Sequence, residues 1–262
     1  MSSQKESTVR TLVVALLVCL VCSVFVSGAA VALRPTQLEN RQLDKQRSIL
    51  AIAGLGEAGM SANQVKTLYN ERIVAKLVNL ETGEYSDEFD PNTFDPLVAA
   101  KDPALSQALP GGEDIASIKR RERYSVVYIV EENGELATLI MPVRGYGLWS
   151  TLYGFMAVKG DLNTVEGLGF YQHGETPGLG GEVDNPKWRS QWQGKQLFTE
   201  DGKLAIRVVK GGVDPQSPRA DHQVDALAGA TLTSNGVDNL LHFWLGENGF
   251  GPFIANLRAG EA

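Results

Sequence analysis

The sequence predicts an α+β fold in which an antiparallel sheet packs against helices, preceded by one N-terminal transmembrane helix. Two apolar runs flank Asn133-Gly134, the strongest short hairpin signal in the chain. The strand-like segments that follow do not alternate regularly with helices, which argues against a doubly wound parallel sheet. Before them, residues 11–33 form a stretch without charge that is long enough to cross a membrane as a helix.

The uncharged stretch, residues 11–33, has two interpretations. Lys5 and Arg10 precede it and "AAVA" at 29–32 lies near its end, as in a secretory signal with a small-residue cleavage site. Its full length fits an uncleaved signal anchor better, which leaves residues 1–10 as a cytoplasmic tail. In both cases we expect the rest of the chain to be exported.

Composition and charge exclude several classes of function. The formal net charge of −7 is unsuited to a nucleic-acid surface, and the basic cluster "KRRER" at 119–123 is interpreted as a solvated helix face or turn. Both cysteines, Cys19 and Cys22, lie in the apolar run, so the exported part has no thiol chemistry. The chain has three histidines: His173, His222 and His242. None of them has another histidine or a cysteine at the spacing of metal ligands, so no metal site is predicted. The chain also lacks G-x-S-x-G, a Walker A pattern and a Rossmann fingerprint in a βαβ unit.

Residues 34–122 are predicted to form an N-terminal segment of helices and a hairpin that ends in a linker. Helices are expected over 36–55, from the spacing of apolar residues, and over 61–73, which opens with a serine suited to capping. A hairpin that turns at Thr82-Gly83 follows. Residues 86–115 are rich in Asp and Pro and are predicted to be a loop or linker.

Residues 123–262 are predicted to form the main domain. Strand-like alternation continues after the first hairpin through residues 154–173, and a further strand is expected over 203–211. A short helix is predicted to start at Pro186, because proline favours the first helical turn. The last predicted helix runs from about residue 233 to 246.

Two glycine-bearing stretches remain as candidates for a site. In "HGETPGLGGE" (173–182), Pro177 and three glycines with positive φ would make a tight turn: Gly178, Gly180 and Gly181. In "DALAGATLTSNG" (225–236), Thr233 or Ser234 would cap the last helix. The same stretches allow a function, because close-packed glycines admit a flat ring and a helix N-terminus attracts a phosphate. From these residues alone, both interpretations remain open.

The chain resembles the C-subunit family of the bacterial sodium-translocating NADH:quinone reductases in four motifs: "GYGLW" at 145–149, "ETPGLGGE", "LAGATLTSNGV" and "HFWLGENGFGPF". Together with the N-terminal span, the resemblance covers nearly the whole chain. Members of this family carry FMN covalently, joined through its phosphate to a threonine in the pattern Asp-x-x-Ser/Thr-Gly-Ala-Thr. The resemblance implies Thr231 as the attachment residue, in a flavinylation motif with Asp225, Gly229 and Ala230. Ala228 departs from the pattern by removing the usual hydroxyl there, but the acceptor is present.

The resemblance also implies which residues surround the flavin. The loops "GYGLW" and "ETPGLGG" are expected to line it, and six residues are expected to bind the cofactor: Trp149, Glu175, Thr176, Leu179, Gly180 and Thr233. Asp225 is expected either to help the flavin-transferring enzyme recognise the chain or to hold the loop.

The implied function is electron relay through covalent FMN in a sodium-pumping NADH:ubiquinone reductase complex. The implied partners are the other subunits, a flavin transferase and the membrane. Residues 123–262 would be an FMN-binding domain on the periplasmic side of the bacterial inner membrane. The G subunit of the related ferredoxin:NAD-linked complex is the nearest alternative, and the added length before the flavin block favours the C-subunit family. The alternative from another class is an exported binding or assembly protein without a cofactor.

Overall fold

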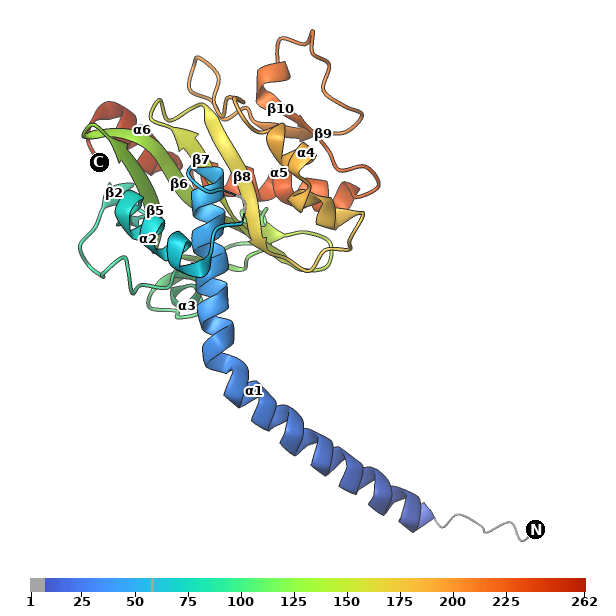
Figure 1. Ribbon diagram of the computed structural model, residues 1–262. Helices are drawn as coiled ribbons and strands as arrows, with labels where there is room; N and C mark the ends of the chain where they lie inside the picture. Colours follow the sequence, from blue (N-terminus) through green and yellow to red (C-terminus); the bar gives the residue numbers. More distant parts are fainter. Residues whose placement is uncertain (1–7, 58) are drawn as a thin grey trace. The chain divides into compact units, whose positions relative to one another are not determined.

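The computed structural model describes residues 8–57 and 59–262 (Figure 1). Within them, the chain forms an N-terminal unit that ends at Asp44 and a compact unit from Lys45 to Ala262. The compact unit contains a six-stranded antiparallel sheet packed with helices, which confirms the predicted α+β class. The predicted tail, residues 1–10, lies outside the described residues except for residues 8–10.

A single helix, α1 (Thr8–Ile52), replaces the two helices predicted over 11–33 and 36–55. Pro35, which lies between the two predicted helices, is inside α1. Proline removes one backbone hydrogen bond, but residues 37–47 contain neither glycine nor a β-branched residue, so the helix continues past it. By length and composition, α1 is long and apolar enough to cross a membrane.

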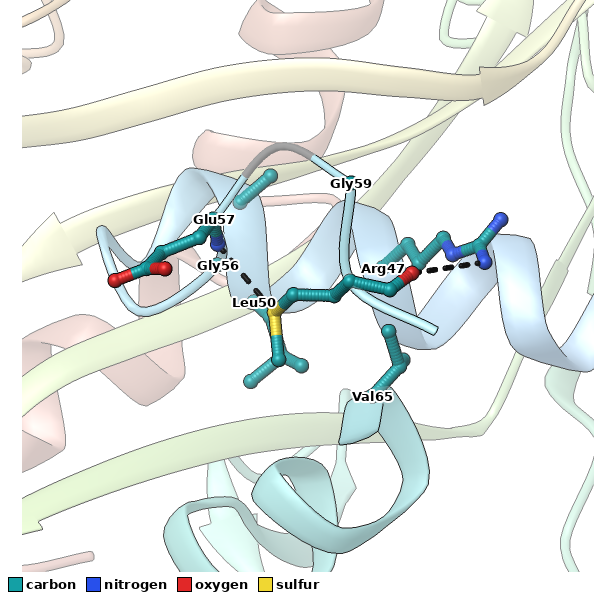
Figure 2. Close-up of a pocket in the computed structure, with 8 residues that line it drawn as sticks. Arg47, Leu50, Gly56, Glu57, Gly59 and Val65 are labelled. Carbon is teal, nitrogen blue, oxygen red and sulfur yellow. Dashed lines mark hydrogen bonds between the residues drawn. The ribbon is translucent and has the colours of Figure 1, made fainter. Parts of the chain in front are cut away.

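The last turns of α1 and the chain that follows pack into the compact unit. Ile49 and Leu50 are buried, and the amide of Gly56 donates to the carbonyl of Leu50 at 3.0 Å. A cavity of about 470 Å³ lies between this segment and α2 (Ala62–Arg72), as Figure 2 shows. The residues that line it are Arg47, Leu50, Ala51, Gly56, Glu57, Gly59, Met60 and Val65.

Helix α2 confirms the helix predicted over 61–73, and a capping box fixes its start. The hydroxyl of Ser61 accepts from the amide of Gln64 at 3.4 Å, and Oε1 of Gln64 accepts from the amide of Ser61 at 2.9 Å. Two amides at the helix entrance are thereby paired without any contribution from the rest of the fold.

The central sheet has the strand order β2-β1-β5-β6-β7-β8, and every neighbouring pair is antiparallel. Its strands are β1 (Val74–Asn79), β2 (Glu84–Tyr85), β5 (Tyr124–Glu132), β6 (Glu135–Tyr146), β7 (Thr151–Lys159) and β8 (Val165–Gln172). Both predicted hairpins are present. Asn133 and Gly134 have φ of 55° and 82°, as a type I′ turn requires, and Gly83 has φ of 71° between β1 and β2.

Helices of the C-terminal half are α4 (Pro186–Ser190), α5 (Thr231–Leu245) and α6 (Gly251–Ala259). Helix α4 starts at Pro186 as predicted, and Oδ1 of Asn185 accepts from the amide of Lys187 at its entrance. Helix α6 is not among the predicted elements. Its sequence nevertheless carries ordinary start and stop signals, with Pro252 in the first turn and Gly260 at φ of 74° after the last residue.

Two small sheets lie outside the central one. Strand β3 (Ser106–Ala108) pairs with β4 (Arg120–Glu122), and β9 (Arg207–Val209) pairs in parallel with β10 (Gln223–Asp225). The strand predicted over 203–211 is shortened to β9 because the chain changes partner: Leu204 bridges to Phe198, and only the later residues reach β10. The remaining elements are two 3-10 helices, η1 (Gly180–Asp184) and η2 (Ala220–His222).

Both faces of the central sheet are covered, which explains the continuous apolar run of β5. Val127 belongs to the core that the sheet shares with α5 and α6. Tyr128, the next residue, points to the opposite face, where its ring meets that of Tyr69 in α2 and lies 5.3 Å from Nζ of Lys45. Successive side chains of a strand alternate between faces, so burial on both sides removes the polar alternation of a half-exposed strand.

The boundary predicted between residues 122 and 123 does not separate two folded units. Strand β1 pairs with β5 along its whole length, from Val74 with Ile129 to Asn79 with Tyr124. The predicted linker over 86–115 contains β3 and a short helix, α3 (Pro96–Ala99). Because β1 and β2 complete the main sheet, this part of the chain belongs to the same compact unit as the rest.

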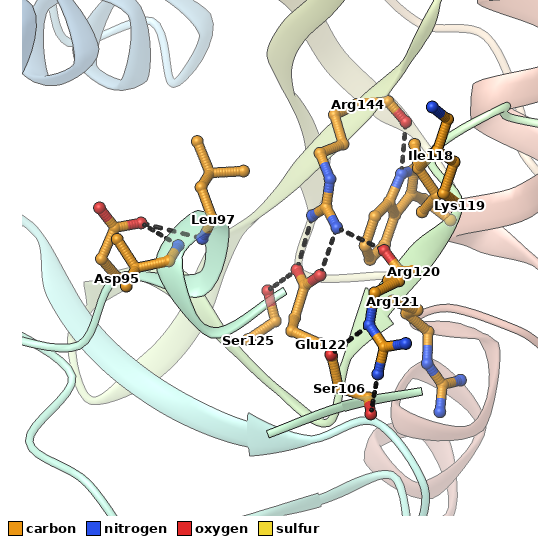
Figure 3. Close-up of polar contacts among 12 residues, drawn as sticks. Asp95, Leu97, Ser106, Ile118, Lys119, Arg120, Arg121, Glu122, Ser125 and Arg144 are labelled. Carbon is orange, nitrogen blue, oxygen red and sulfur yellow. Dashed lines mark hydrogen bonds and ion pairs between the residues drawn. The ribbon is translucent and has the colours of Figure 1, made fainter. Parts of the chain in front are cut away.

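The basic cluster at 119–123, predicted to be solvated, is partly buried, because it forms β4 and contributes an internal ion pair. Nη1 of Arg144 in β6 donates to Oε1 of Glu122 at 2.8 Å, and both side chains are buried (Figure 3). The guanidinium of Arg144 lies 4.9 Å from the ring of Trp244 in α5, whose Nε1 donates to the carbonyl of Arg144 at 2.7 Å. Burial lowers the pKa of Arg144, but the charge and hydrogen bonds of Glu122 outweigh it and raise the pKa. The pair therefore ties β4 and β6 to α5.

Candidate functional site

Three segments converge on the carboxylate of Glu175: the loop 147–150 after β6, the segment 173–181, and the first turn of α5. Glu175 is only 5% exposed. Its Oε1 accepts, at 3.0 to 3.2 Å, from three consecutive backbone amides: Leu148, Trp149 and Ser150. Its Oε2 accepts from the hydroxyl of Thr233 at 2.7 Å. One buried side chain thus joins three parts of the chain that are distant in sequence.

Two glycines make room for this carboxylate. A Cβ at Gly147 would lie 2.6 Å from Oε1 of Glu175, and a Cβ at Gly180 would lie 2.5 Å from the hydroxyl oxygen of Thr233. Of the three glycines predicted to take positive φ, Gly178 does so at 75°, whereas Gly180 and Gly181 do not. That prediction is wrong for the latter two, because close packing and not backbone conformation restricts Gly180.

Hydrogen bonding lowers the pKa of the Glu175 carboxyl. Burial by itself raises the pKa of this carboxyl, but hydrogen bonds from Thr233 and from the amides of the loop 147–150 outweigh burial, so the pKa lies below its usual value. An unfolded Glu titrates at about pH 4.3. The stabilisation from these bonds is therefore fully present above that pH and is lost as the pH falls through the lower folded value.

Helix α5 begins two residues earlier than predicted, and its cap is not a hydroxyl. The N-cap residue is Ala230, which makes no side-chain hydrogen bond. Thr233 and Ser234 lie inside the first turn and are buried, so their predicted role as caps is wrong. Thr233 donates to Glu175, and the hydroxyl of Ser234 accepts from the amide of Leu227 at 2.9 Å and donates to the carbonyl of Ala230 at 3.0 Å. Ser234 thereby braces the turn that leads into the helix.

The entrance of α5 carries free hydrogen-bond donors. Among the described residues, no acceptor pairs with the backbone amides of Thr231, Leu232 and Thr233. Thr231 is itself exposed. A helix entrance without a capping side chain leaves these amides, and the positive end of the helix dipole, available to an anion. The hydroxyl of Thr231 lies at the same entrance, on the first helical residue.

The segments that meet at this entrance carry exposed apolar side chains. Leu232 is 58% exposed and Trp149 is 65% exposed, and Tyr146, Leu148 and Leu179 are exposed as well. A Cβ at Gly229 would lie 3.3 Å from Cδ2 of Leu179, which places that leucine against the turn before Thr231. The carbonyl of Thr176 accepts from the amides of Leu179 and Gly181 and closes the "ETPGLGG" turn. In the part of the chain that the structure describes, exposed apolar side chains and amides without an acceptor thus lie on the same segments.

Asp225 holds a neighbouring loop. Its Oδ1 accepts from the amide of Val213 at 2.7 Å, and its backbone pairs with Val209 between β10 and β9. Gly211 and Gly212 in that loop have positive φ. Of the two roles predicted for Asp225, this arrangement accounts for holding the loop.

The cavity next to α2 lies apart from this site. None of the residues predicted to surround a flavin is among those that line the cavity in Figure 2. Within residues 8–57 and 59–262, no group of three or more His, Cys, Asp or Glu side chains has the geometry of a metal site. The two glycine-bearing motifs meet at the entrance of α5, where Glu175 accepts from Thr233 and Gly180 packs against both side chains.

The comparisons with known proteins identify the family. The FMN-binding domain family matches residues 147–246, which include the loop 147–150, the "ETPGLGG" turn and the whole of α5. The C subunit of the Na(+)-translocating NADH-quinone reductase of Pseudomonas aeruginosa is 72% identical, over 99% of this chain and 100% of its own length. This chain belongs to the C-subunit family.

Further members agree with this identification. The C subunit from Yersinia pestis is 50% identical over 97% of this chain and 95% of its own length. The crystal structure of Shewanella oneidensis NqrC has a TM-score of 0.74 and 40% identity, covering 82% of this chain and 96% of that one. The resemblance to the C-subunit family is confirmed, and the names of these relatives favour it over the G-subunit alternative.

Several residues that build the site at the entrance of α5 are not among those predicted from the motifs. Gly147 lies in "GYGLW" without a predicted role, and Ser150 and Ser234 are likewise outside the predicted set. Gly147 could have been found from its position directly after β6, at the start of a tight loop. The three amides that follow it donate to a carboxylate. Nothing in the local sequence indicates that Glu175, 25 to 27 residues later, supplies that acceptor.

Proposed function

We propose that this chain carries FMN covalently, as a phosphoester of the Thr231 hydroxyl, and relays electrons in a sodium-translocating NADH:quinone reductase complex. The observation that carries the proposal is the entrance of α5. An exposed threonine begins a 15-residue helix whose N-cap is an alanine and whose first amides are unpaired. A phosphate on that threonine would be bonded to the first helical residue, next to the amides that are free to donate to it.

The surroundings of Thr231 suit a flavin. The amides of residues 231–233 can donate to phosphate oxygens, and the helix dipole favours the negative charge. The exposed Trp149 and Leu179 offer apolar contact to an aromatic ring, with Thr176 and Gly180 in the adjoining turn. Glu175 and Thr233 are buried behind these residues. These features support a site for both the phosphate and the ring of FMN.

In this proposal the redox step belongs to the flavin, which accepts and releases electrons when bound. The residues of the chain do three other things. Thr231 would tether the phosphate, the free amides of α5 would orient it, and the exposed apolar side chains would shield the ring from water. The chain needs no acid–base residue of its own. NADH oxidation, sodium movement and quinone reduction would belong to partner subunits of the complex.

We also propose that α1 anchors the chain in the bacterial inner membrane, with the compact unit on the periplasmic side. A covalent tether suits that side, because a cofactor lost there by dissociation is not readily replaced. A flavin transferase would attach the FMN. If α1 is an uncleaved anchor, N-terminal sequencing of the mature chain should begin at or near residue 1. A sequence beginning near Leu33 would contradict the anchor.

Covalent attachment is tested by denaturing the purified chain. We expect the flavin to stay with the polypeptide on a denaturing gel and to fluoresce there, because a phosphoester survives unfolding. A flavin bound only by the fold would leave the chain when the compact unit unfolds. A dark band from a preparation that was yellow before denaturation would contradict the phosphoester, and a colourless preparation would favour a cofactor-free binding protein.

A further inference from the structure

We propose that Glu175 is a positioning residue, which sets the distance between the loop 147–150 and the entrance of α5, and so shapes the flavin site without contacting the flavin. The proposal rests on the proposed function. It assigns Glu175 a different task from the flavin contact expected from the sequence.

The carboxylate has no free capacity for a ligand. Oε1 accepts from the amides of residues 148, 149 and 150, and Oε2 accepts from Thr233 and, at 3.2 Å, again from the amide of Leu148. The side chain is buried at the junction of the three segments. Three successive amides that converge on one point form an anion-binding nest, and here the anion is the protein's own. Among the described residues, no lysine, arginine or histidine forms an ion pair with Glu175.

The donors held by Glu175 belong to the residues that surround the attachment site. Leu148 and Trp149 present exposed apolar side chains while their amides are fixed on the carboxylate. Thr233 lies one residue beyond Leu232 and two beyond Thr231 in the first turn of α5. Fixing these backbone groups therefore fixes the apolar surface relative to the attachment hydroxyl.

The glycines on either side show that this arrangement tolerates little displacement. A Cβ at Gly147 would lie 2.6 Å from Oε1, and a Cβ at Gly180 would lie 2.7 Å from Oε2. Real Cβ atoms do not approach other atoms this closely, so the carboxylate fills the space between the two turns completely.

Two variants of Glu175 separate positioning from charge. Glu175→Ala removes the acceptor and leaves the amides unpaired. In Glu175→Gln, the amide oxygen can accept from the loop while the NH₂ group donates to the hydroxyl oxygen of Thr233, so the shape is kept without the charge. Asp238→Ala is the matched control, because that carboxylate also ties α5 to a neighbouring strand, accepting from the amide of Val208 at 2.8 Å and from Arg207 at 2.9 Å.

The measurements are the fraction of full-length chain carrying covalent flavin, from intact mass, and the visible spectrum and midpoint potential of that flavin. We expect Glu175→Ala to lower the flavin fraction at least about tenfold, since a single lost hydrogen bond to a charged group already corresponds to about that factor, and to shift the spectrum of the remainder. Glu175→Gln should retain most of the flavin with a spectrum close to that of the wild type. Asp238→Ala should keep its flavin.

The proposal is overturned if Glu175→Ala unfolds cooperatively yet keeps the wild-type flavin fraction, spectrum and potential. It is also overturned if Gln and Ala lower the flavin fraction equally, because then the charge and not the shape is required. Should Glu175→Ala fail to fold, Thr233→Val removes one of the same bonds. It should shift the flavin fraction in the same direction by less, and an unchanged fraction and spectrum would overturn the proposal. A wild-type chain without covalent flavin would instead contradict the proposed function.

Discussion

Replacing Thr231 with alanine should abolish covalent flavin completely while leaving the fold intact. The change removes the only oxygen proposed to form the ester. Thr231 is exposed, and the helix is capped at Ala230 without a side chain, so little buried surface and no cap is lost. We expect the free energy of unfolding to change by at most about 0.5 kcal/mol. Intact mass gives the loss of flavin, and thermal unfolding followed by circular dichroism gives the stability.

A matched control is Thr176→Ala. Thr176 is also exposed, it lies in the "ETPGLGG" turn, and only its carbonyl takes part in the hydrogen bonds that close that turn. Thr176 lies beside the ring in the proposal but offers no oxygen to the ester, so loss of its hydroxyl should leave the flavin covalently attached even where the spectrum changes. Flavin that persists on the Thr231→Ala chain after denaturation would contradict the assignment of the attachment residue.

Replacing Glu122 with alanine should lower the free energy of unfolding more than any other substitution considered for this chain. The change leaves the buried guanidinium of Arg144 without its charged partner. Burial disfavours the charge of Arg144, and in the wild type Glu122 compensates for this. Removing one member of a buried ion pair costs about 3–5 kcal/mol. Because Arg144 also contacts Trp244, the loss should loosen α5 on β6. Urea unfolding monitored by circular dichroism measures the change.

An exposed pair serves as the control for Glu122. Glu132 pairs with Arg72 at 3.4 Å, and the side chain of Glu132 is largely exposed while that of Arg72 is half-buried. Glu132→Ala should change the free energy of unfolding by no more than about 1 kcal/mol. If Glu122→Ala is no more destabilising than this control, the buried pair does not hold β4, β6 and α5 together as described.

Elements encoded by local turn and cap chemistry could be predicted from the sequence. Asn133-Gly134 gives a type I′ hairpin because both residues accept positive φ, and Ser61 with Gln64 closes a capping box. These signals act within a few residues and need no knowledge of the rest of the fold. The same holds for the start of α4 at Pro186.

Features decided by tertiary contacts could not be predicted. Hydroxyls cap helices, which predicts a start of α5 at Thr233, but the bond to Glu175 draws that hydroxyl into the core and the helix begins at Thr231. The pairing of β1 with β5 joins segments that the sequence separates by a long acidic stretch. The candidate site also combines a feature encoded locally with one decided by a tertiary contact. Its attachment threonine lies in a recognisable motif, whereas the carboxylate that assembles it depends on a contact across 58 residues.

Peptide mapping tests the attachment site most directly. Trypsin should release one peptide from Ala220 to Arg258, since no lysine or arginine lies between Arg219 and Arg258. It contains the exposed hydroxyl of Thr231 and the two buried hydroxyls of Thr233 and Ser234. We expect fragment ions to place the entire mass of FMN, less one water, on Thr231. FMN on Thr233 or Ser234, or a peptide without added mass from a fluorescent chain, would contradict the account.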